Sequence, residues 1–323
     1  MIDARADLRK SVATAVAVLK SKNLVAIPTE TVYGLAGNAL EPEAVARIFE
    51  AKERPYFDPL IVHLGSQEWL GQLTRSSPES RWLAEELVRR FWPGPLTILF
   101  GKSDLVPDLV TAGTEYVAIR MPSHPLFREV LRVFGKPLAA PSANRFGRVS
   151  PTTAEHVLEE LNGRIPLILD AGPTDLGLES TIVRVEADRI GILRQGPITQ
   201  EILAQIAPTE ELAGSEKTLV PGQATSHYAP SKAVRLFDLL AVTPRWQEAA
   251  LICWGPIHHT SDFPVVRSLS ETRDLRIAAQ RLFGLLREID QLNVERIYIE
   301  PVPEVGLGKA IMDRVRRAVA PRQ

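Results

Sequence analysis

The hydrophobic positions of residues 1–207 switch repeatedly between a helical and an extended pattern. Apolar residues recur at helical spacing in the segments 11–19, 41–52, 79–91 and 199–207. Short apolar runs bounded by Pro, Gly and polar residues indicate strands at 24–28, 59–64, 93–100, 116–122, 137–141, 166–172, 180–186 and 189–196. Because several of these runs follow one another without a helix between them, the pattern predicts a mixed sheet with flanking helices.

The pattern becomes simpler after residue 232. Strand-like runs at 233–237, 249–255, 263–269 and 296–301 alternate with helical segments at 271–292 and 308–320. This alternation is typical of a small parallel αβα layer fold. Residues 208–232 show no sustained periodicity and are rich in turn formers, which indicates a connector. The sequence therefore predicts an α/β protein with domains at 1–207 and 233–323 and a linker at 208–232.

Length and charge limit the classes of partner. The 323 residues exceed the usual size of one hydrophobic core, which agrees with two domains. The formal net charge is -1, and 24% of the residues are charged. Tight, sequence-independent binding to nucleic acid usually requires a strong cationic excess, so a polyanion would have to be met by a local patch. A small phosphorylated ligand fits this balance better.

Targeting and redox signals are weak. The apolar run at 11–19 follows the acidic Asp3 and Asp7 and lacks a small-residue cleavage pattern, so an amphipathic helix is a better interpretation than a signal peptide. No run of 18 or more apolar residues is present, so no membrane span is expected. The single cysteine, Cys253, lies in the apolar run "ALICWG", which favours a buried structural thiol over a nucleophile.

Two short motifs in the first domain carry candidate chemistry. "PTETVYGL" at 28–35 places the hydroxyls of Thr29, Thr31 and Tyr33 at the carboxyl end of a strand, where α/β sheets bind ligands. A purely structural turn explains this octapeptide equally well. "KERPYFDPL" at 52–60 sets Lys52 and Arg54 before a turn and a strand. A solvated pair of surface charges is the default interpretation of two such cations.

A third motif is more informative. In "APSANRFGRVSPTTAEH" the polar Ser142 and Asn144 lie in a loop with two arginines, just before a helix start. Backbone amides at a helix start and neighbouring hydroxyls are suited to phosphate oxygens. Helix capping alone would also explain Ser150 and Thr152.

Arginines at strand ends suggest an anionic ligand. Arg120 in "VAIRMP" and Arg194 in "ILRQG" each end a strand, and "GLESTIV" places Ser180 at a strand entrance. Their planar donors suit carboxylates and phosphates, although arginines at such positions can simply be solvated. No P-loop, G-x-G-x-x-G or H-E-x-x-H motif is present, and "GLGKA" at 306–310 is interpreted as a helix start. The six histidines show no metal-ligand spacing, so no resident metal is expected.

The motifs together resemble one family. They stand in the order "PTETVYGL", "KERPYFDPLIVHL", "WPGPLT", "VAIRMPSHP", "APSANRFGRVSPTTAEH", "DAGPTDLGLESTIV", "ILRQGPIT" and "PGQATSHYAP". This order is similar to the long form of L-threonylcarbamoyladenylate synthase over nearly the whole chain. The resemblance implies a YrdC-like domain for 1–207, with a twisted mixed sheet and flanking helices, and a small Rossmann-like αβα domain for 233–323. "PGQ" and "SANRFG" replace the commoner "PGM" and "SANPSG".

The resemblance also implies an activity. L-Threonine, bicarbonate or CO2, and ATP would give threonylcarbamoyl-AMP, pyrophosphate and water, with Mg2+ bound together with ATP. A separate transferase, met only transiently, would then move the threonylcarbamoyl group to an adenosine of certain tRNAs. Stable direct tRNA binding and a membrane are not expected, and the protein would be cytoplasmic.

The resemblance assigns two sets of site residues. For ATP it implies Lys52, Arg54, Asp58, Tyr116, Ser142, Asn144, Ser150, Arg194 and Tyr228. For threonine it implies Thr31, His63, Arg120, Ala140 and Ser180. Lys52 and Arg54 match the K-x-R pair that would face the triphosphate and serve catalysis, and Arg120 would bind the threonine carboxylate, whereas Ala140 would contribute backbone only.

Two of these assignments are weaker, and a third concerns motion. Asp58 stands where the family often has Asn, and a carboxylate there would repel phosphates unless Mg2+ or Lys52 intervenes; Tyr116 is also a weak match. In the linker, Tyr228 resembles the residue that folds back over the nucleotide. We expect it to belong to a lid that is mobile when empty and ordered over ATP.

Two other functions stay open on the sequence alone. One is an RNA-binding module, because the stretch from Arg128 to Arg148 carries five basic residues against Glu129 alone. The overall charge argues against it. The other is carbamoyl transfer from carbamoyl phosphate, as in larger proteins with a related domain; the acylphosphatase-like and zinc-binding segments of those proteins are missing here.

Overall fold

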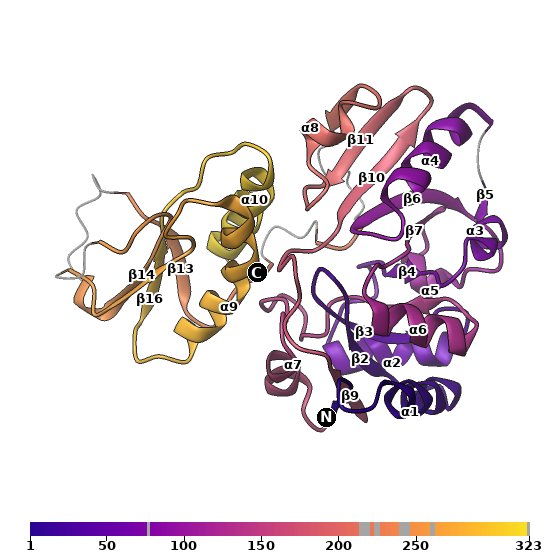
Figure 1. Cartoon of the computed structure of the whole chain (residues 1–323), viewed down its shortest axis with the longest axis horizontal. Helices are drawn as coiled ribbons and strands as arrows, with labels where there is room; N and C mark the ends of the chain where they lie inside the picture. The colour runs from indigo at the N-terminus through magenta and orange to yellow at the C-terminus, as the bar shows by residue number, and fades with distance from the viewer. Residues whose placement is uncertain (76–77, 213–219, 223–226, 239–245, 259–261, 322–323) are drawn as a thin grey trace.

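A computed structural model of the chain describes residues 1–75, 78–212, 220–222, 227–238, 246–258 and 262–321, which form two α/β domains (Figure 1). The first domain contains the strands β1 (Ile2–Asp3), β2 (Val25–Pro28), β3 (Tyr33–Asn38), β4 (Ile61–His63), β5 (Thr74–Arg75), β6 (Leu96–Lys102), β7 (Tyr116–Arg120), β8 (Leu138–Ala139), β9 (Leu167–Asp170), β10 (Thr181–Glu186), β11 (Arg189–Arg194) and β12 (Thr209–Glu211). Its helices are α1 (Leu8–Lys20), α2 (Pro42–Lys52), α3 (Glu68–Leu73), α4 (Pro78–Phe91), α5 (Asp108–Thr111), α6 (Pro125–Phe134), α7 (Ala154–Leu161) and α8 (Gln200–Leu203).

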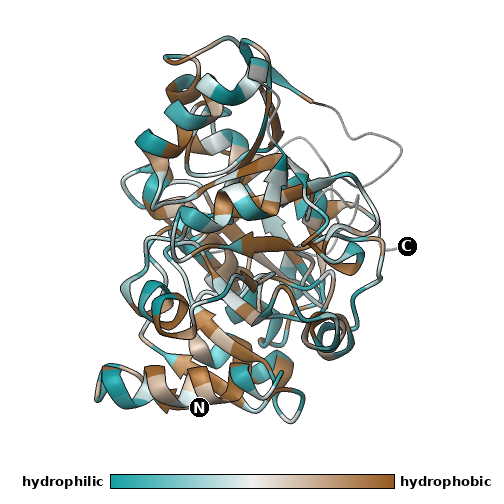
Figure 2. Cartoon of the chain, turned by 90° about the vertical axis from the view of Figure 1, so that its right-hand side faces the viewer, coloured by the Kyte–Doolittle hydropathy of each residue, from teal (hydrophilic) through white to brown (hydrophobic). Residues whose placement is uncertain are grey.

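The first domain is built on one twisted mixed sheet, as the pattern predicted. The strand order is β1-β9-β2-β3-β8-β4-β7-β6-β10-β11-β12, and β5 pairs with β6 off this path. Parallel pairs such as β4 with β7 stand beside antiparallel pairs such as β6 with β7. Figure 2 shows the mostly brown, apolar strands inside and helices whose outward faces carry teal, polar residues. This burial of apolar area supplies most of the stabilisation.

Helix α1 illustrates how the sequence sets its own boundaries. The Asp7 side chain accepts a hydrogen bond from the Lys10 backbone N–H and so caps the first turn. The buried positions Val12, Ala15, Val16 and Leu19 follow helical spacing and form one apolar stripe. This stripe packs in a core cluster with residues of α6 and of the strands β2 and β9. The amphipathic-helix interpretation of this segment is therefore confirmed.

The second domain has a parallel four-stranded sheet in the order β13-β16-β14-β15. Its elements are β13 (Ala233–Leu236), the 3-10 turn Trp246–Glu248, β14 (Ala249–Cys253), β15 (Val265–Ser268), α9 (Leu275–Asp290), β16 (Arg296–Ile299) and α10 (Leu307–Val319). Cys253 is fully buried, and the segment "GLGKA" starts α10 with Gly306 as its N-cap, as predicted. Among the described residues, no helix is long and apolar enough to cross a membrane.

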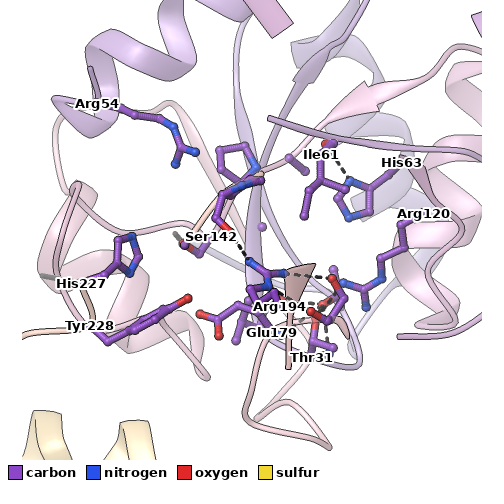
Figure 3. A pocket seen from close by; sticks show the side chains of 18 residues that line it. Thr31, Arg54, Ile61, His63, Arg120, Ser142, Glu179, Arg194, His227 and Tyr228 are labelled. Atoms are coloured by element: carbon purple, nitrogen blue, oxygen red, sulfur yellow. Dashed lines mark hydrogen bonds between the residues drawn. The ribbon is translucent and has the colours of Figure 1, made fainter. Parts of the chain in front are cut away.

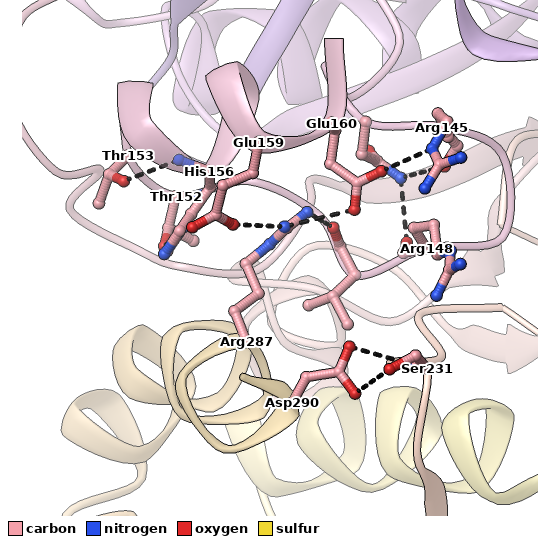
Figure 4. Close-up of polar contacts among 12 residues, drawn as sticks. Arg145, Arg148, Thr152, Thr153, His156, Glu159, Glu160, Ser231, Arg287 and Asp290 are labelled. Carbon is pink, nitrogen blue, oxygen red and sulfur yellow. Dashed lines mark hydrogen bonds and ion pairs between the residues drawn. The ribbon is translucent and has the colours of Figure 1, made fainter. Parts of the chain in front are cut away.

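The two domains share a core. In Figure 1, helices α9 and α10 of the second domain face the first domain. Val32, Val149, Leu178 and Tyr228 belong to the same buried cluster as apolar residues of α9 and α10. Figure 4 shows a polar part of this interface, in which Arg287 of α9 reaches the first domain. Because apolar and charged groups are both buried there, the contact resembles a domain core more than a loose tether.

Some elements differ from the expectation. Strand β3 was not predicted: it begins with the last residues of "PTETVYGL" and pairs antiparallel with β2. Helix α6 was not predicted. Strand β12 lies inside the segment predicted as a linker and pairs in parallel with β11. The first sheet therefore continues past residue 207, and its strands are not complete there. The domain boundaries otherwise stay a prediction, and residues 213–219 and 223–226 of the linker lie outside the described residues.

Candidate functional site

Two neighbouring parallel strands bring a histidine and an arginine to the same edge of the sheet. His63 is the last residue of β4, Arg120 is the last residue of β7, and the two are register partners. Open α/β sheets bind ligands outside the carboxyl ends of parallel strands. Both side chains are buried, at 2% and 3% exposure. His63 stacks on Phe127 with ring centroids 5.3 Å apart.

Burial fixes the charge state of His63. Desolvation and then the neighbouring Arg120 lower its pKa from 6.5 to about 3, so the imidazole is neutral at physiological pH. Its Nδ1 lies 3.2 Å from the Ile61 carbonyl oxygen. A neutral ring beside a guanidinium offers polar contacts without adding a further positive charge.

The turn between β2 and β3 presents Thr31 to Arg120. Thr29 Oγ1 donates a hydrogen bond to the Val32 carbonyl and accepts hydrogen bonds from the backbone N–H groups of Thr31 and Val32. This hydroxyl therefore stabilises the turn. Arg120 Nη1 donates to Thr31 Oγ1 at 3.0 Å. Arg120 Nη2 forms an ion pair with Glu30 Oε1 at 2.7 Å, and both side chains are buried. Burial raises the pKa of Glu30, but the charge of Arg120 and the hydrogen bonds to the carboxylate together have the larger effect. The pKa of Glu30 therefore lies below its ordinary value. The motif is thus both a structural turn and part of the site.

Lys52 and Arg54 are not solvated surface charges. Glu53 ends α2 in the left-handed conformation, with φ of 53°, and the chain turns so that both neighbours are buried. Arg54 Nη2 forms an ion pair with Asp58 Oδ2 at 2.9 Å and donates to the Pro59 carbonyl at 2.7 Å. Desolvation raises the pKa of Asp58, and Arg54 and Lys52 oppose this rise. Arg54 is therefore the partner that makes a carboxylate at position 58 tolerable.

Lys52 supports a loop instead of facing open space. Its Nζ donates to the carbonyl oxygens of Ser142 and Asn144, at 2.5 Å each. Desolvation and then Arg54 lower the pKa of Lys52 well below its ordinary value. Asn144 Nδ2 in turn donates to the carbonyls of Arg145 and Arg148. The lysine and the asparagine together fix the loop that presents Ser142.

A third arginine enters from the other half of the sheet. Arg194 ends β11, and its Nε and Nη2 donate to the Ser180 carbonyl and hydroxyl at 3.0 Å each. Its Nη1 donates to the Pro221 carbonyl at 3.1 Å. Ser180 Oγ also lies 2.7 Å from Thr97 Oγ1. In the part of the chain that the structure describes, the hydrogen bonds of Arg194 go to neutral acceptors, so its positive charge is the least compensated of the three arginines at the site.

Glu179 connects three elements. Its Oε1 accepts from the Ser150 hydroxyl, and its Oε2 accepts from Arg314 Nε of α10 at 3.2 Å. Ser150 is fully buried and does not cap a helix; Thr153 caps α7 instead, accepting from the His156 backbone N–H. The capping interpretation of Ser150 is therefore wrong.

His227 and Tyr228 form the wall that faces the second domain. The Tyr228 ring stacks on Phe283 of α9 with centroids 5.5 Å apart, and the guanidinium of Arg314 lies 5.4 Å from its centroid. The backbone of Tyr228 is in the left-handed region, with φ of 60°, which is a strained choice for an aromatic residue. Gly222 allows this arrangement, because a Cβ there would lie 2.6 Å from Tyr228 Oη.

These elements enclose one cavity (Figure 3). Of the fourteen residues predicted for the site, nine line it: Thr31, Arg54, His63, Arg120, Ala140, Ser142, Ser180, Arg194 and Tyr228. In Figure 3, Arg54, His227 and Tyr228 lie on one side and Thr31, His63 and Arg120 on the other, with Arg194 between them. Lys52, Asp58, Asn144 and Ser150 lie behind this lining and bond to its members or to the loops that carry them.

Tyr116 does not join them. It starts β7, at the opposite end of the strand from Arg120, and is 37% exposed. At about 3.3 Å per residue, four residues of strand separate the two by roughly 13 Å. The ring lies 6.0 Å from the Arg184 guanidinium and lines a different hollow. The expectation that Tyr116 contacts the nucleotide is therefore not supported.

Sequence reasoning missed three residues of the site. Glu30 lies between the two threonines of "PTETVYGL", and its pairing with Arg120 depends on a contact across 90 positions that no local pattern reveals. Glu179 stands next to Ser180 in "GLESTIV", but neither the motif nor the resemblance assigned it to the site. His227 precedes Tyr228 and lines the cavity beside it. An acidic residue next to strand-end hydroxyls is the signal that could have suggested Glu30 and Glu179.

The carboxylates at the cavity are already engaged. Glu30, Asp58 and Glu179 each form an ion pair with an arginine. A cluster of side chains that could bind a metal ion lies instead in the second domain, at the carboxyl ends of β14 and β16. It consists of Cys253, His258 and Glu300. There His258 and Glu300 form an ion pair at 2.7 Å.

Two family models match consecutive parts of the chain. Residues 17–196 match the model described as "Telomere recombination", and residues 198–320 match the model described as "Threonylcarbamoyl-AMP synthase, C-terminal domain". A Bacillus subtilis (strain 168) protein named threonylcarbamoyl-AMP synthase is 40% identical over 326 residues, which cover 96% of this chain and 93% of that protein. A Pyrococcus abyssi protein of the same name is 38% identical and covers 93% of this chain and 91% of its own length.

A solved structure gives the same result in three dimensions. The crystal structure of P. abyssi Sua5 complexed with L-threonine matches with a TM-score of 0.86 and 37% sequence identity. The match covers 95% of this chain and 94% of that chain. Both domains and their arrangement are therefore shared.

The buried His63 predicts a measurable pH effect. Between pH 6.5 and about 3, the unfolded chain binds a proton at this residue that the folded chain excludes, so stability falls as the pH falls through this window. His63→Gln should reduce the slope of the unfolding free energy against pH, between pH 5 and 6, by up to about 1.4 kcal/mol per pH unit. Urea unfolding of both proteins at several pH values measures this, and equal slopes would show that His63 is protonated in the folded protein.

Proposed function

The chain belongs to the threonylcarbamoyl-AMP synthase family, and on that premise we propose how its residues make threonylcarbamoyl-AMP from L-threonine, bicarbonate or CO2, and ATP. One observation carries the assignment of roles: three buried arginines from different elements line a single cavity whose two sides differ in chemistry. Two anionic substrates, one a carboxylate and one a triphosphate, suit such a cavity.

The reaction needs positioning and charge compensation more than a protein nucleophile. The threonine amine and bicarbonate form a carbamate with loss of water. A carbamate oxygen then attacks the α-phosphorus of ATP, a new P–O bond forms, the bond to the β-phosphate oxygen breaks, and pyrophosphate leaves. Holding both anions in line and stabilising the charge on the phosphates is sufficient for catalysis of this kind.

Threonine is assigned to the side formed by Thr31, His63 and Arg120. Arg120 is the cation for the amino acid carboxylate, and the neighbouring Glu30 limits its excess charge. Neutral His63 and the Thr31 hydroxyl add polar contacts, while Ala140 and Ser180 complete this side. The P. abyssi structure is a complex with L-threonine, which supports an amino acid site in this fold.

The triphosphate is assigned to the side formed by Arg54, Ser142 and Arg194. Arg194 lies between the two sides in Figure 3, where the carbamate would meet the α-phosphorus. Lys52 contributes indirectly, because its hydrogen bonds to two carbonyl oxygens position the loop that carries Ser142. Asn144 stabilises the same loop. Mg2+ would be held by phosphate oxygens and water, because the carboxylates at the cavity are paired with arginines. When bound, it would neutralise part of the phosphate charge.

Tyr228 is assigned to closing the cavity. The cavity has a volume of about 40 Å³, whereas pockets for ligands of this size are roughly 300–1,000 Å³. The wall must therefore move to admit ATP, and Tyr228, with its strained backbone, is the wall residue suited to do so. Contacts with Phe283 and Arg314 already bury it, so protein packing rather than ATP alone orders this residue. The rest of the expected lid, residues 223–226, lies outside the described residues.

The product would be handed to a transferase for tRNA modification, in a transient encounter. Stable RNA binding is not favoured as the main activity. Of the basic residues between Arg128 and Arg148, Arg132 forms an ion pair with Glu129 at 2.6 Å and Arg145 with Glu160 at 3.1 Å. This pairing reduces the positive charge available to a polyanion.

Pyrophosphate release from ATP tests the proposed reaction. We expect release only when L-threonine and bicarbonate are present together, because the carbamate is the attacking group. Serine should be a poorer substrate, since one methyl group in a fitted pocket is worth roughly 1–3 kcal/mol. Equal release after omission of threonine would contradict the assignment.

The division of the cavity can be tested with variants that leave no carboxylate unpaired. Arg54→Met combined with Asp58→Asn should lower turnover by roughly 10²-fold relative to Asp58→Asn alone, because a preorganised charge is lost from the triphosphate side. Arg120→Met combined with Glu30→Gln should raise the KM for threonine more than the KM for ATP. Steady-state kinetics in both substrates measures this, and the reverse pattern would overturn the assignment of the two sides.

Tyr228→Ala should lower kcat/KM for ATP by roughly tenfold or more and release AMP without the carbamoyl product, because water then reaches the mixed anhydride. Tyr228→Phe is the matched control, which keeps the ring and should retain most of the activity. Chromatography of the nucleotide products measures both quantities. Wild-type kinetics in Tyr228→Ala would show that the ring is only part of the domain interface.

A further inference from the structure

A fully buried arginine of the second domain reaches the cavity of the first. Arg314 lies in the middle of α10 and is 1% exposed. Its Nε donates to Glu179 Oε2 at 3.2 Å, its Nη1 donates to Asp313 at 2.8 Å, and its guanidinium lies 5.4 Å from the Tyr228 ring centroid. The second domain therefore contacts both a lining carboxylate and the closing tyrosine.

The backbone around Tyr228 is held by the same helix. The His227 N–H donates to the Arg317 carbonyl of α10 at 3.3 Å, and the Ala229 N–H donates to the Gly147 carbonyl of the first domain at 3.0 Å. Tyr228 is thus fixed on one side by α10 and on the other by the loop that carries Ser142. A displacement of α10 would alter both contacts.

Glu179 is an unfavourable residue for a cavity that takes a triphosphate. It lines the cavity together with Arg54 and Arg194, and its Oε1 accepts from Ser150. An unpaired carboxylate at this place would repel phosphate oxygens, and repulsion between like charges is strong where water is excluded. The ion pair with Arg314 cancels this charge and leaves the carboxylate free to orient the Ser150 hydroxyl.

Stability alone is a poor reason for burying Arg314. The attraction within a buried ion pair often fails to outweigh the free-energy cost of removing both groups from water. Arg314 Nη2 also has no hydrogen-bond partner among the described residues, which adds to that cost. An apolar residue would join the domains without this desolvation cost, because the surrounding cluster of α9 and α10 is already apolar.

We propose that Arg314 is a positioning residue for the nucleotide side of the site: by pairing with Glu179 across the domain interface, it removes a repulsive charge from the triphosphate site and keeps Ser150 and Tyr228 in place. The second domain is then a part of the ATP site and not only an appendage. This inference rests on the proposed function, since it takes ATP as the ligand of that side.

Calorimetric titration with ATP and Mg2+ tests the coupling in a double-mutant cycle of the full chain. Arg314→Met leaves Glu179 unpaired, so we expect the Kd for ATP to rise about tenfold or more. Glu179→Gln in the same chain removes the repulsion, so the double variant should regain most of the affinity. The Kd for threonine should change less than that for ATP in Arg314→Met.

Arg287→Met is the matched control for a purely structural role. Arg287 is a second buried arginine of the interface, and it pairs with Glu160 of α7 at 3.4 Å (Figure 4). Among the described residues, its hydrogen bonds and ion pairs go to Val149, Glu159 and Glu160 and not to Glu179. We expect that adding Glu179→Gln does not relieve any effect of Arg287→Met. If Arg314→Met fails to fold, Arg314→Lys, which keeps the charge, should bind ATP within about threefold of wild type.

The measured affinities separate a failure of this inference from a failure of the proposed function. Recovery of ATP affinity by Glu179→Gln only in the Arg314→Met background supports the inference. Unchanged ATP affinity in Arg314→Met, a loss that Glu179→Gln does not relieve, or a loss of more than threefold in Arg314→Lys overturns it while leaving the proposed function intact. If wild type does not bind ATP, the proposed function itself fails.

Discussion

A buried positive charge without a buried negative partner is strongly destabilising, and this constraint shapes the site. Glu30 accompanies Arg120, Asp58 accompanies Arg54, and Glu179 accompanies the distant Arg314. The first two pairs let the guanidinium groups of Arg120 and Arg54 line the cavity while both side chains stay buried. Arg194, held by neutral carbonyl and hydroxyl groups, leaves its charge available.

The fold serves this arrangement by bringing distant segments to one edge. The strands β4, β7 and β11 end at the cavity, the β2–β3 turn supplies Thr31, and the connector supplies Tyr228. The second domain closes the remaining side through α9 and α10, with Phe283 and Arg314 against Tyr228. In the proposed mechanism, activity and domain docking depend on the same contacts, so the second domain has a role besides holding the linker.

The sequence was most informative where chemistry lies at strand ends. His63, Arg120 and Arg194 lie within two residues of the ends that the apolar runs predicted for their strands, and family resemblance named nine of the eighteen residues that line the cavity. The sequence could not reveal the ion pairs of Arg120 with Glu30 and of Arg314 with Glu179, because each of these two pairs joins positions far apart in the chain. Tyr116 was misplaced because a motif match does not say which end of a strand faces the ligand. Strand β12 was missed because a strand of three polar residues gives no alternating hydrophobic pattern.

Identification of the product tests the central claim most directly. The enzyme is incubated with ATP, Mg2+, L-threonine and isotopically labelled bicarbonate, quenched rapidly, and the nucleotides are separated and weighed by mass spectrometry. The account predicts one adenylate that contains both threonine and the labelled carbon, formed in equal amount with pyrophosphate. Formation of pyrophosphate with an adenylate that lacks the labelled carbon would contradict it.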